Sequence, residues 1–420
     1  RAPENTGIMG GFAAPAWIRG GLARARALPS AVDGRRNMSR DVKKKAVMVA
    51  ATGQHHGKTT VTLGMVSMLL DRGLKVGYQK PVGQQTVPVM DGEKGELQID
   101  RDVDIFKFMW PQLVGSYSDS SPVAFPPGFT RTVLDGKVKA SDLKEKCRQS
   151  FDRIVDEVDY LVVEGTGHIG VGAIIDLNNA QVAAELGVDV VMVTPGGLGV
   201  SFDVLAVNYS MLKEYGVKLK GVILNKVDPS KRQMNVEYYS KALKRWDVPL
   251  MGVIPQETSL PLLSMKAFAK ILPHATFISC PDKELRFFHH IRLLVTPEDT
   301  QELKSPLEMS SLVILHSSCQ RTLTEVIDQH RQSRMEGKGD LGGGVIVVGP
   351  DAPSAENIRE LEEEGVPALY VKKVNFDGTG FELIGKVMGH THKHHRADIN
   401  RIHRTCEHVS AHIDLDAIMA

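Results

Sequence analysis

The sequence predicts an α/β fold in which a parallel sheet carries helices on both faces. Between residues 46 and 255, short apolar runs of strand length alternate with segments whose apolar residues recur at helical spacing. Several of the helical segments end at a glycine, namely Gly73, Gly187 and Gly216. This regular alternation is typical of parallel strands that are joined by crossing helices.

The order of elements follows from these runs and their boundaries. Residues 87–98 are polar and contain glycine, which predicts a loop, and the Pro- and Ser-rich residues 116–136 predict a lid or substrate loop. Strands are expected at 46–49, 74–78, 160–164, 188–194, 222–224 and 251–254, and helices at 61–70, at 179–186 and in segments ending at 108 and 215. A second, smaller α/β unit is expected after residue 261, with strands at 312–315, 344–348 and 368–371 and helices at 322–327 and 355–364.

A glycine-rich turn, residues 50–60, joins the first predicted strand to the first predicted helix. Gly57, Lys58 and Thr59 stand where that helix begins. Backbone N–H groups of such a turn and the helix dipole point at phosphates, so this order predicts a phosphate-binding loop. The usual pattern has glycine where this chain has Thr52, and the alternative is an ordinary strand-to-helix turn. The candidate nucleotide-binding residues of the loop are Gly53, Gln54, His55, His56, Gly57, Lys58, Thr59 and Thr60.

Charged residues at other strand ends could serve the phosphates or a magnesium ion. Lys58 can neutralise β- and γ-phosphate oxygens, and the Thr59 hydroxyl can ligate Mg²⁺. Lys80 follows a predicted strand at its carboxyl end, the edge where parallel sheets bind ligands. Asp102, the middle one of three alternating carboxylates, is either a magnesium ligand or part of an acidic helix start. Glu164 ends an apolar strand, which suits a second metal ligand or an ordinary strand end.

Asn225, Lys226 and Asp228 follow the strand at 222–224. Their spacing is the one that small GTPases use to read guanine, and the Asn225 amide suits contact with a base edge. A motif of only four residues, 225–228, is weak evidence for guanine, so we favour ATP over GTP as the nucleotide.

Composition excludes several classes of protein. The 420 residues are 42% hydrophobic and 24% charged with a net charge of +1, which supports two or three globular domains and gives no electrostatic reason to expect nucleic acid or an anionic membrane. The four cysteines form no Cys-x-x-Cys pair, as expected in a reducing compartment. No apolar run is long enough to span a bilayer.

The two ends of the chain are less informative. Residues 1–43 are rich in Arg, Ala and Gly, which is typical of a transit peptide; the alternative is an upstream region before a start at Met38. We therefore expect a cytoplasmic protein, or an organellar one if that segment is a transit peptide. Histidines recur near the C-terminus and either are solvated or bind a metal: His390, His392, His394, His395, His403, His408 and His412.

These motifs together resemble those of a known group of P-loop proteins. Residues 51–60, 80–83, Asp102, 163–168 and 225–226 resemble the dethiobiotin synthetase-like branch, which also contains cobyrinic acid a,c-diamide synthases and the non-catalytic N-terminal part of long phosphate acetyltransferases. A glycine displaced as in residues 52–53 is normal in that branch. Residues 343–349, 367–369 and 412–416 resemble the DRTGG domain found beside it, although the literal signature is absent.

The resemblance implies both domain limits and roles. It implies an extension at 1–43, a P-loop domain at 44–260 and a DRTGG-like domain at 261–420. Lys58 and Thr59 would hold the phosphates and magnesium, Asp102 and Glu164 would complete the metal shell, Lys80 would face the γ-phosphate and substrate, and Asn225 would contact the base. The implied chemistry is ATP-driven phosphorylation of a small carboxylate or carbamate, in a homodimer.

Two further functions compete with this enzyme. A nucleotide sensor would bind ATP and signal through the second domain, as a relative of the non-catalytic acetyltransferase segment. Acetyl transfer itself is not expected, because the separate acetyl-transfer domain is missing. Glutamine-dependent amidation is not expected either, since neither Cys319 nor Cys406 stands in a turn that suits a nucleophile.

Overall fold

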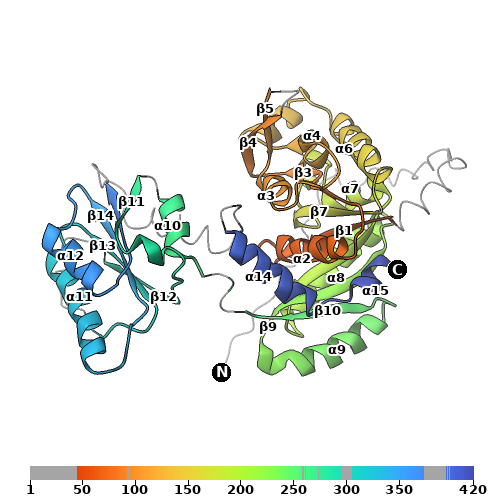
Figure 1. Ribbon diagram of the computed structural model, residues 1–420. Coiled ribbons are helices and arrows are strands. Elements are labelled where there is room, and N and C mark those ends of the chain that lie inside the picture. Colours follow the sequence, from red (N-terminus) through yellow and green to blue (C-terminus); the bar gives the residue numbers. More distant parts are fainter. Residues whose placement is uncertain are drawn as a thin grey trace, which may run out of the picture.

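The computed structural model describes residues 45–420 except 92–94, 258–259, 261, 273, 295–304, 373–393, 395 and 397. Figure 1 shows two α/β units, one formed mainly by residues 46–255 and the other by residues 265–372. Within the described residues, no helix combines the length and apolar character that a membrane span requires.

The larger unit is built on a sheet of six parallel strands in the order β10-β9-β8-β1-β7-β2. The central strand β1 is fully buried and apolar along its whole length, as expected for a strand covered on both faces. The strands are β1 (Ala46–Ala51), β2 (Val76–Gln79), β7 (Tyr160–His168), β8 (Asp189–Pro195), β9 (Leu219–Val227) and β10 (Leu250–Pro255).

Helices cover both faces of this sheet, which confirms the predicted fold class. One face packs against α6 (Ala140–Val155), α7 (Asn179–Leu186), α8 (Val200–Glu214) and α9 (Arg232–Lys244). The opposite face packs against α2 (Lys58–Asp71), α3 (Arg101–Met109), α14 (Ile399–Ser410) and α15 (Leu415–Met419).

The segment between β2 and α6 differs from the prediction. Residues 87–98 are not an irregular loop, because β4 (Thr86–Asp91) and β5 (Gly95–Asp100) form an antiparallel hairpin. Val87 pairs with Ile99 and Val89 with Leu97, so apolar residues do alternate on one side of the hairpin. The expected lid also contains short elements, namely α4 (Tyr117–Ser120), β6 (Val123–Ala124), which pairs with β3 (Val82–Gly83), and α5 (Phe129–Leu134).

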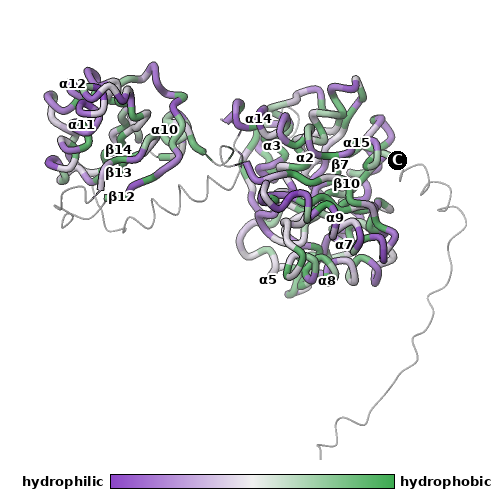
Figure 2. Tube along the Cα trace, turned by 90° about the horizontal axis from the view of Figure 1, so that it is seen from below, coloured by the Kyte–Doolittle hydropathy of each residue, from purple (hydrophilic) through white to green (hydrophobic). Residues whose placement is uncertain are grey.

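The smaller unit has its own sheet, in the order β11-β15-β14-β13-β12, and a core on each side of it. All neighbouring strands are parallel except β11, which is antiparallel to β15. Figure 2 shows mostly hydrophilic residues on the outer helix α12 of this unit. Its elements are α10 (Met265–Ile271), β11 (Ala275–Ser279), β12 (His290–Leu294), β13 (Ser311–His316), α11 (Gln320–Met335), β14 (Gly344–Gly349), α12 (Ala355–Glu363) and β15 (Ala368–Lys372).

The last two helices pack against the larger unit, although the sequence placed them with the smaller one. Figure 1 shows α14 beside α2 and α15 near β10. Ile402, Cys406 and Val409 are buried in the core that also contains α2, and they recur at the spacing of one helix face. Gly64 on α2 provides the room, since a Cβ there would lie 2.3 Å from the Val409 side chain. An apolar helix face needs a partner, and α2 supplies it.

Candidate functional site

The glycine-rich turn links the carboxyl end of β1 to the start of α2. Gly57 caps the helix with a φ of 95°, a left-handed conformation that favours glycine. A Cβ on Gly57 would lie 1.9 Å from Nδ2 of Asn225, so the loop and the end of β9 fit together only without a side chain there. The first N–H groups of α2 therefore face the space above the sheet edge.

Thr52 has a structural role in this turn. Its buried hydroxyl donates to Thr194 Oγ1 on β8 (3.0 Å) and lies 2.9 Å from Nδ1 of His56. Gly53 leaves room for the His56 ring, because a Cβ at that residue would come within 2.4 Å of it. Thr52 thus ties the loop to the neighbouring strand, which explains why the glycine follows one position later.

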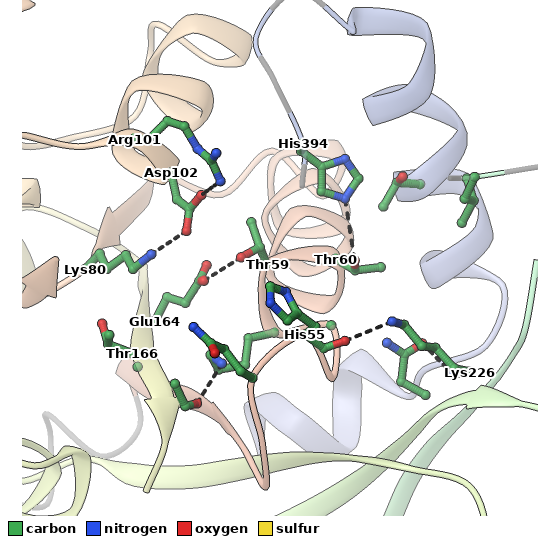
Figure 3. A pocket seen from close by; sticks show the side chains of 18 of the residues that line it. His55, Thr59, Thr60, Lys80, Arg101, Asp102, Glu164, Thr166, Lys226 and His394 are labelled. Atoms are coloured by element: carbon green, nitrogen blue, oxygen red, sulfur yellow. Dashed lines mark hydrogen bonds and ion pairs between the residues drawn. The ribbon is translucent and has the colours of Figure 1, made fainter. Parts of the chain in front are cut away.

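A cavity of about 350 Å³ lies against the loop. It is lined by loop residues, by the ends of β2, β7, β9 and β10, and by residues of α14. Figure 3 shows how the labelled side chains converge on this space from both sides of α2. Of the predicted residues, the lining includes Gln54, His55, Gly57, Lys58, Thr59, Thr60, Lys80, Asp102, Glu164 and Asn225.

Lys58 reaches across the cavity to the turn that follows β7. Its Nζ donates a hydrogen bond to the carbonyl of Gly167 (2.7 Å). Asn179 fixes that turn, since its amide donates to the carbonyls of Thr166 and His168, both at 2.7 Å. Burial lowers the pKa of Lys58 to about 8, against the opposing effect of Glu164. The lysine is thus held on the cavity by strand-end backbone.

Thr59 and Glu164 form a polar pair at the start of α2. The Thr59 hydroxyl donates to Glu164 Oε1 (2.7 Å), and the Tyr78 hydroxyl donates to Oε2 (3.0 Å). Glu164 is only 1% exposed, and burial raises its pKa to about 7, with a further contribution from Asp102. The carboxylate therefore lies in a place where its negative charge lacks full compensation, and a cation would be favoured there.

Lys80 lies between two aspartates. Its Nζ is 3.0 Å from Oδ1 of Asp100 and forms a short hydrogen bond with Asp102. Burial alone would raise the pKa of Asp102, but the Lys80 ammonium holds it at about 2. Asp100 also caps α3 by accepting from the backbone N–H of Asp102 (2.9 Å). Asp104 instead contacts Arg396 (3.2 Å), so the three alternating carboxylates have separate roles.

Thr59, Asp102 and Glu164 offer hard oxygen donors on one cavity, which fits Mg²⁺. Within the described ranges, no group of three or more His, Cys, Asp or Glu could hold a metal ion. His408 and His412 are adjacent, yet each contacts a backbone carbonyl, of Pro255 and His408 respectively. His390, His392 and His395 lie outside the described residues.

The residues after β9 brace the loop. Asn225 Nδ2 donates to the carbonyl of His56 (2.9 Å), and Lys226 Nζ donates to the carbonyl of His55 (2.8 Å). Asp228 is exposed and accepts from the N–H and hydroxyl of Ser230 (2.9 and 2.7 Å). Since Asp228 is engaged in a turn and does not line the cavity, this segment is not arranged as a guanine reader.

The sequence analysis missed one wall of the cavity. Arg101, Pro255, Gln256, Glu257 and Leu260 line it, as do His394, Arg401, Thr405 and His408 from the C-terminal part. Arg401, Thr405 and His408 recur at the spacing of one helix face, and this pattern could have indicated from the sequence that they act together. Residues 116–136, the expected lid or substrate loop, contain Thr130 and Arg131 on α5, and none of these residues lines the cavity.

A parallel sheet, a glycine-rich turn and Lys-Thr at a helix start define a P-loop protein. The chain belongs to the AAA domain family AAA_26, which matches residues 45–261. It is 26% identical over 216 residues to ATP-dependent dethiobiotin synthetase BioD of Methanocaldococcus jannaschii, covering 50% of this chain and 92% of that protein. It is 25% identical over 229 residues to a probable cobyric acid synthase of Methanococcus maripaludis, covering 51% of this chain and 46% of that relative.

Solved structures are more distant. Septum site-determining protein MinD of Pyrococcus horikoshii, complexed with Mg-ADP, is 16% identical with a TM-score of 0.30, covering 51% of this chain and 83% of that one. The match to BioD, within the family-matched region, confirms the predicted likeness to dethiobiotin synthetases for the first domain. The region after residue 261 is outside the family match, so its DRTGG-like character stays a prediction.

Proposed function

We propose that this protein binds Mg-ATP at the P-loop and transfers the γ-phosphoryl group to a small carboxylate or carbamate. The observation that carries the proposal is that Lys58, Lys80 and the Thr59–Glu164 pair meet on one cavity at the start of α2. Two lysines and a helix N-terminus suit a polyphosphate, and the oxygen ligands suit its magnesium. The name of the BioD relative, which states dependence on ATP, supports ATP as the nucleotide.

Each side chain has a distinct part in such a reaction. Lys58 leaves the Gly167 carbonyl and binds the β- and γ-phosphate oxygens, while Thr59, Asp102 and Glu164 hold the magnesium. The bound Mg²⁺ supplies charge neutralisation on those oxygens. Lys80, held by its two aspartates, offsets the repulsion between the substrate carboxylate and the γ-phosphate. A carboxylate oxygen forms the new bond to phosphorus as the bond to the bridging oxygen breaks, and ADP leaves with that electron pair.

ATP is preferred to GTP in this proposal. Asn225 lines the cavity, but its amide donates to the His56 carbonyl and accepts from the Lys226 N–H. Asp228, the residue that would pair with guanine, is engaged with Ser230, so neither side chain is arranged to read guanine. The homodimer and the cytoplasmic location stay predictions.

The first test is nucleotide binding by isothermal titration with Mg-ATP and Mg-GTP. We expect the wild type to bind Mg-ATP and Lys58→Ala to lose at least about tenfold in affinity, because a charge-assisted contact to phosphate disappears. Lys107→Ala is the matched control, since Lys107 is a half-buried lysine that also donates to backbone carbonyls, those of Leu113 and Gly115, yet it does not line the cavity. The absence of any nucleotide binding by the wild type would refute the proposal.

The second test separates the enzyme from a nucleotide sensor. Wild-type protein with Mg-ATP is screened with small carboxylates and carbamates, and ADP release is followed together with hydroxylamine trapping of an acyl phosphate. Stimulated ADP release with a trapped product supports phosphoryl transfer. Tight binding of ATP without turnover on any of these substrates would instead favour the sensor.

A further inference from the structure

The helix α14 lies outside the region that matches the family, yet it lines the cavity. Arg401, Thr405 and His408 are separated by four and then three residues, which places them on one face of the helix. In most surface helices the polar face meets solvent. Here part of it meets the cavity instead, with Arg401 only 5% exposed and Thr405 fully buried. This polar face of α14 is therefore part of the cavity wall.

A neighbouring face of the same helix fixes its position. Cys406 lies against the Leu63 carbonyl (3.6 Å) and Val409 fits over Gly64. Before the helix begins, Nε2 of His394 lies 3.5 Å from the Thr60 hydroxyl, as Figure 3 shows. The C-terminal segment is thus held along α2, beginning beside the phosphate loop.

The polar face lines the cavity and reaches the end of β10. Arg401 lines the same cavity as Thr60 and the start of α2. His408, two turns further, contacts the Pro255 carbonyl at the end of β10 (2.9 Å). A nucleotide whose phosphates lie at the start of α2 would extend along this face toward Pro255.

The chemistry of Arg401 suits an anion. A guanidinium is costly to bury unless charge-assisted partners satisfy it, and its planar fork matches phosphate oxygens. Asp398, which precedes α14 as its N-cap, lies 3.9 Å from Nη1 of Arg401, and the Arg401 side chain also lines the cavity. Burial also lowers the pKa of Arg401, which reflects a cation in a poorly solvated place.

We propose that α14 is the outer wall of the nucleotide site and that Arg401 binds a phosphate group of the nucleotide, while Thr405 and His408 contact the part that extends toward β10. This inference rests on the proposed function, because it assigns a ligand to the same cavity. It adds a binding residue from the chain beyond the AAA domain. The same helix contacts the smaller unit, since Arg404 lies over the Phe287 ring (4.9 Å), so the nucleotide site and that unit share one element.

The test compares Arg401→Gln with Arg404→Gln by isothermal titration of Mg-ATP. Both variants remove one guanidinium from α14, but Arg404 does not line the cavity. We expect Arg401→Gln to weaken binding by about tenfold or more, Arg401→Lys to restore part of the loss, and Arg404→Gln to stay within about twofold of wild type. Binding by Arg401→Gln within about twofold of wild type would overturn the inference while leaving the proposed function intact.

Hydrogen exchange of residues 399–410 tests whether Arg401→Gln weakens binding only because it unfolds α14. In the wild type, Mg-ATP should slow exchange in α14, and in Arg401→Gln this extra protection should be absent. Equal exchange of the two proteins without nucleotide shows that the helix is still folded in the variant. Unchanged exchange of wild-type α14 under saturating Mg-ATP would also overturn the inference, whereas failure of the wild type to bind would refute the proposed function first.

Discussion

Replacing Glu164 by glutamine should make the ligand-free protein less sensitive to pH. Glu164 is 1% exposed, accepts from Thr59 and Tyr78, and has a pKa raised to about 7 by burial. In the unfolded chain this carboxyl titrates near 4.5. Below that pH the carboxyl is protonated in both the folded and the unfolded state, so it does not change the free energy of unfolding. Between the two values the unfolded state loses its proton and the folded state keeps it, so the free energy of unfolding falls as the pH rises.

The size of this effect follows from the two pKa values. At about 1.4 kcal/mol for each pH unit between 4.5 and about 7, the full penalty is about 3 kcal/mol, reached above the folded-state pKa. Roughly two-thirds of it should develop between about pH 5 and about pH 7.5. Glutamine has the same shape and carries no charge, so Glu164→Gln lacks this dependence. Magnesium would favour the ionised form, so the same substitution should weaken binding of Mg-ATP.

The assay is denaturant unfolding of wild type and Glu164→Gln, each measured at about pH 5 and at about pH 7.5. Other titrating groups are shared by the two proteins, so the difference between their pH dependences isolates Glu164. We expect the variant to gain about 2 kcal/mol relative to wild type on going from the lower to the higher pH. A gain below about 0.5 kcal/mol, or a loss, would refute the reasoning that this carboxylate is buried without full compensation.

Three further predictions test other parts of the structure. Lys80→Met removes the buried cation that two aspartates share, so denaturant unfolding should show a loss of about 3–5 kcal/mol, and a loss under about 1 kcal/mol would contradict the network. Gly57→Ala places a Cβ 1.9 Å from Asn225 Nδ2 and should weaken Mg-ATP binding at least about tenfold, unlike Gly73→Ala, which meets nothing within 4 Å. Burial lowers the pKa of His330 to about 4, so the neutral ring contributes its full stability above pH 6.5 and this contribution is lost as the pH falls. His330→Gln should therefore lose less of its free energy of unfolding on acidification, as measured by circular dichroism. An unchanged loss of stability in acid would contradict this prediction.

Most of the first fold could be predicted because its strands are covered on both faces. A strand such as 46–51 must be apolar at every position, and its following helix must begin at the glycine-rich turn, so both leave a local trace in the sequence. The hairpin β4–β5 escaped prediction because Pro88 and the polar residues between its strands conceal a short alternation of apolar residues. Its pairing depends on contact between two segments that are individually too short to identify.

Some residues of the site could also be predicted from the sequence, whereas the roles of others could not. Lys58, Thr59, Lys80 and Glu164 could be named because each follows a strand, and parallel strands end at one edge of the sheet. Only the tertiary structure showed that Asn225 braces the loop and that Asp228 turns into solvent, since those contacts depend on side-chain directions.

The sequence by itself determined the P-loop fold and the residues that gather at its phosphate end, because local patterns of burial and turn geometry specify them. It did not determine where the C-terminal helix would lie. The apolar stripe of α14 required some partner, but the choice of α2 depended on the space above Gly64, more than 300 residues earlier in the chain. That packing helps to place Arg401 on the cavity, because complementarity between distant surfaces is a property of the folded chain.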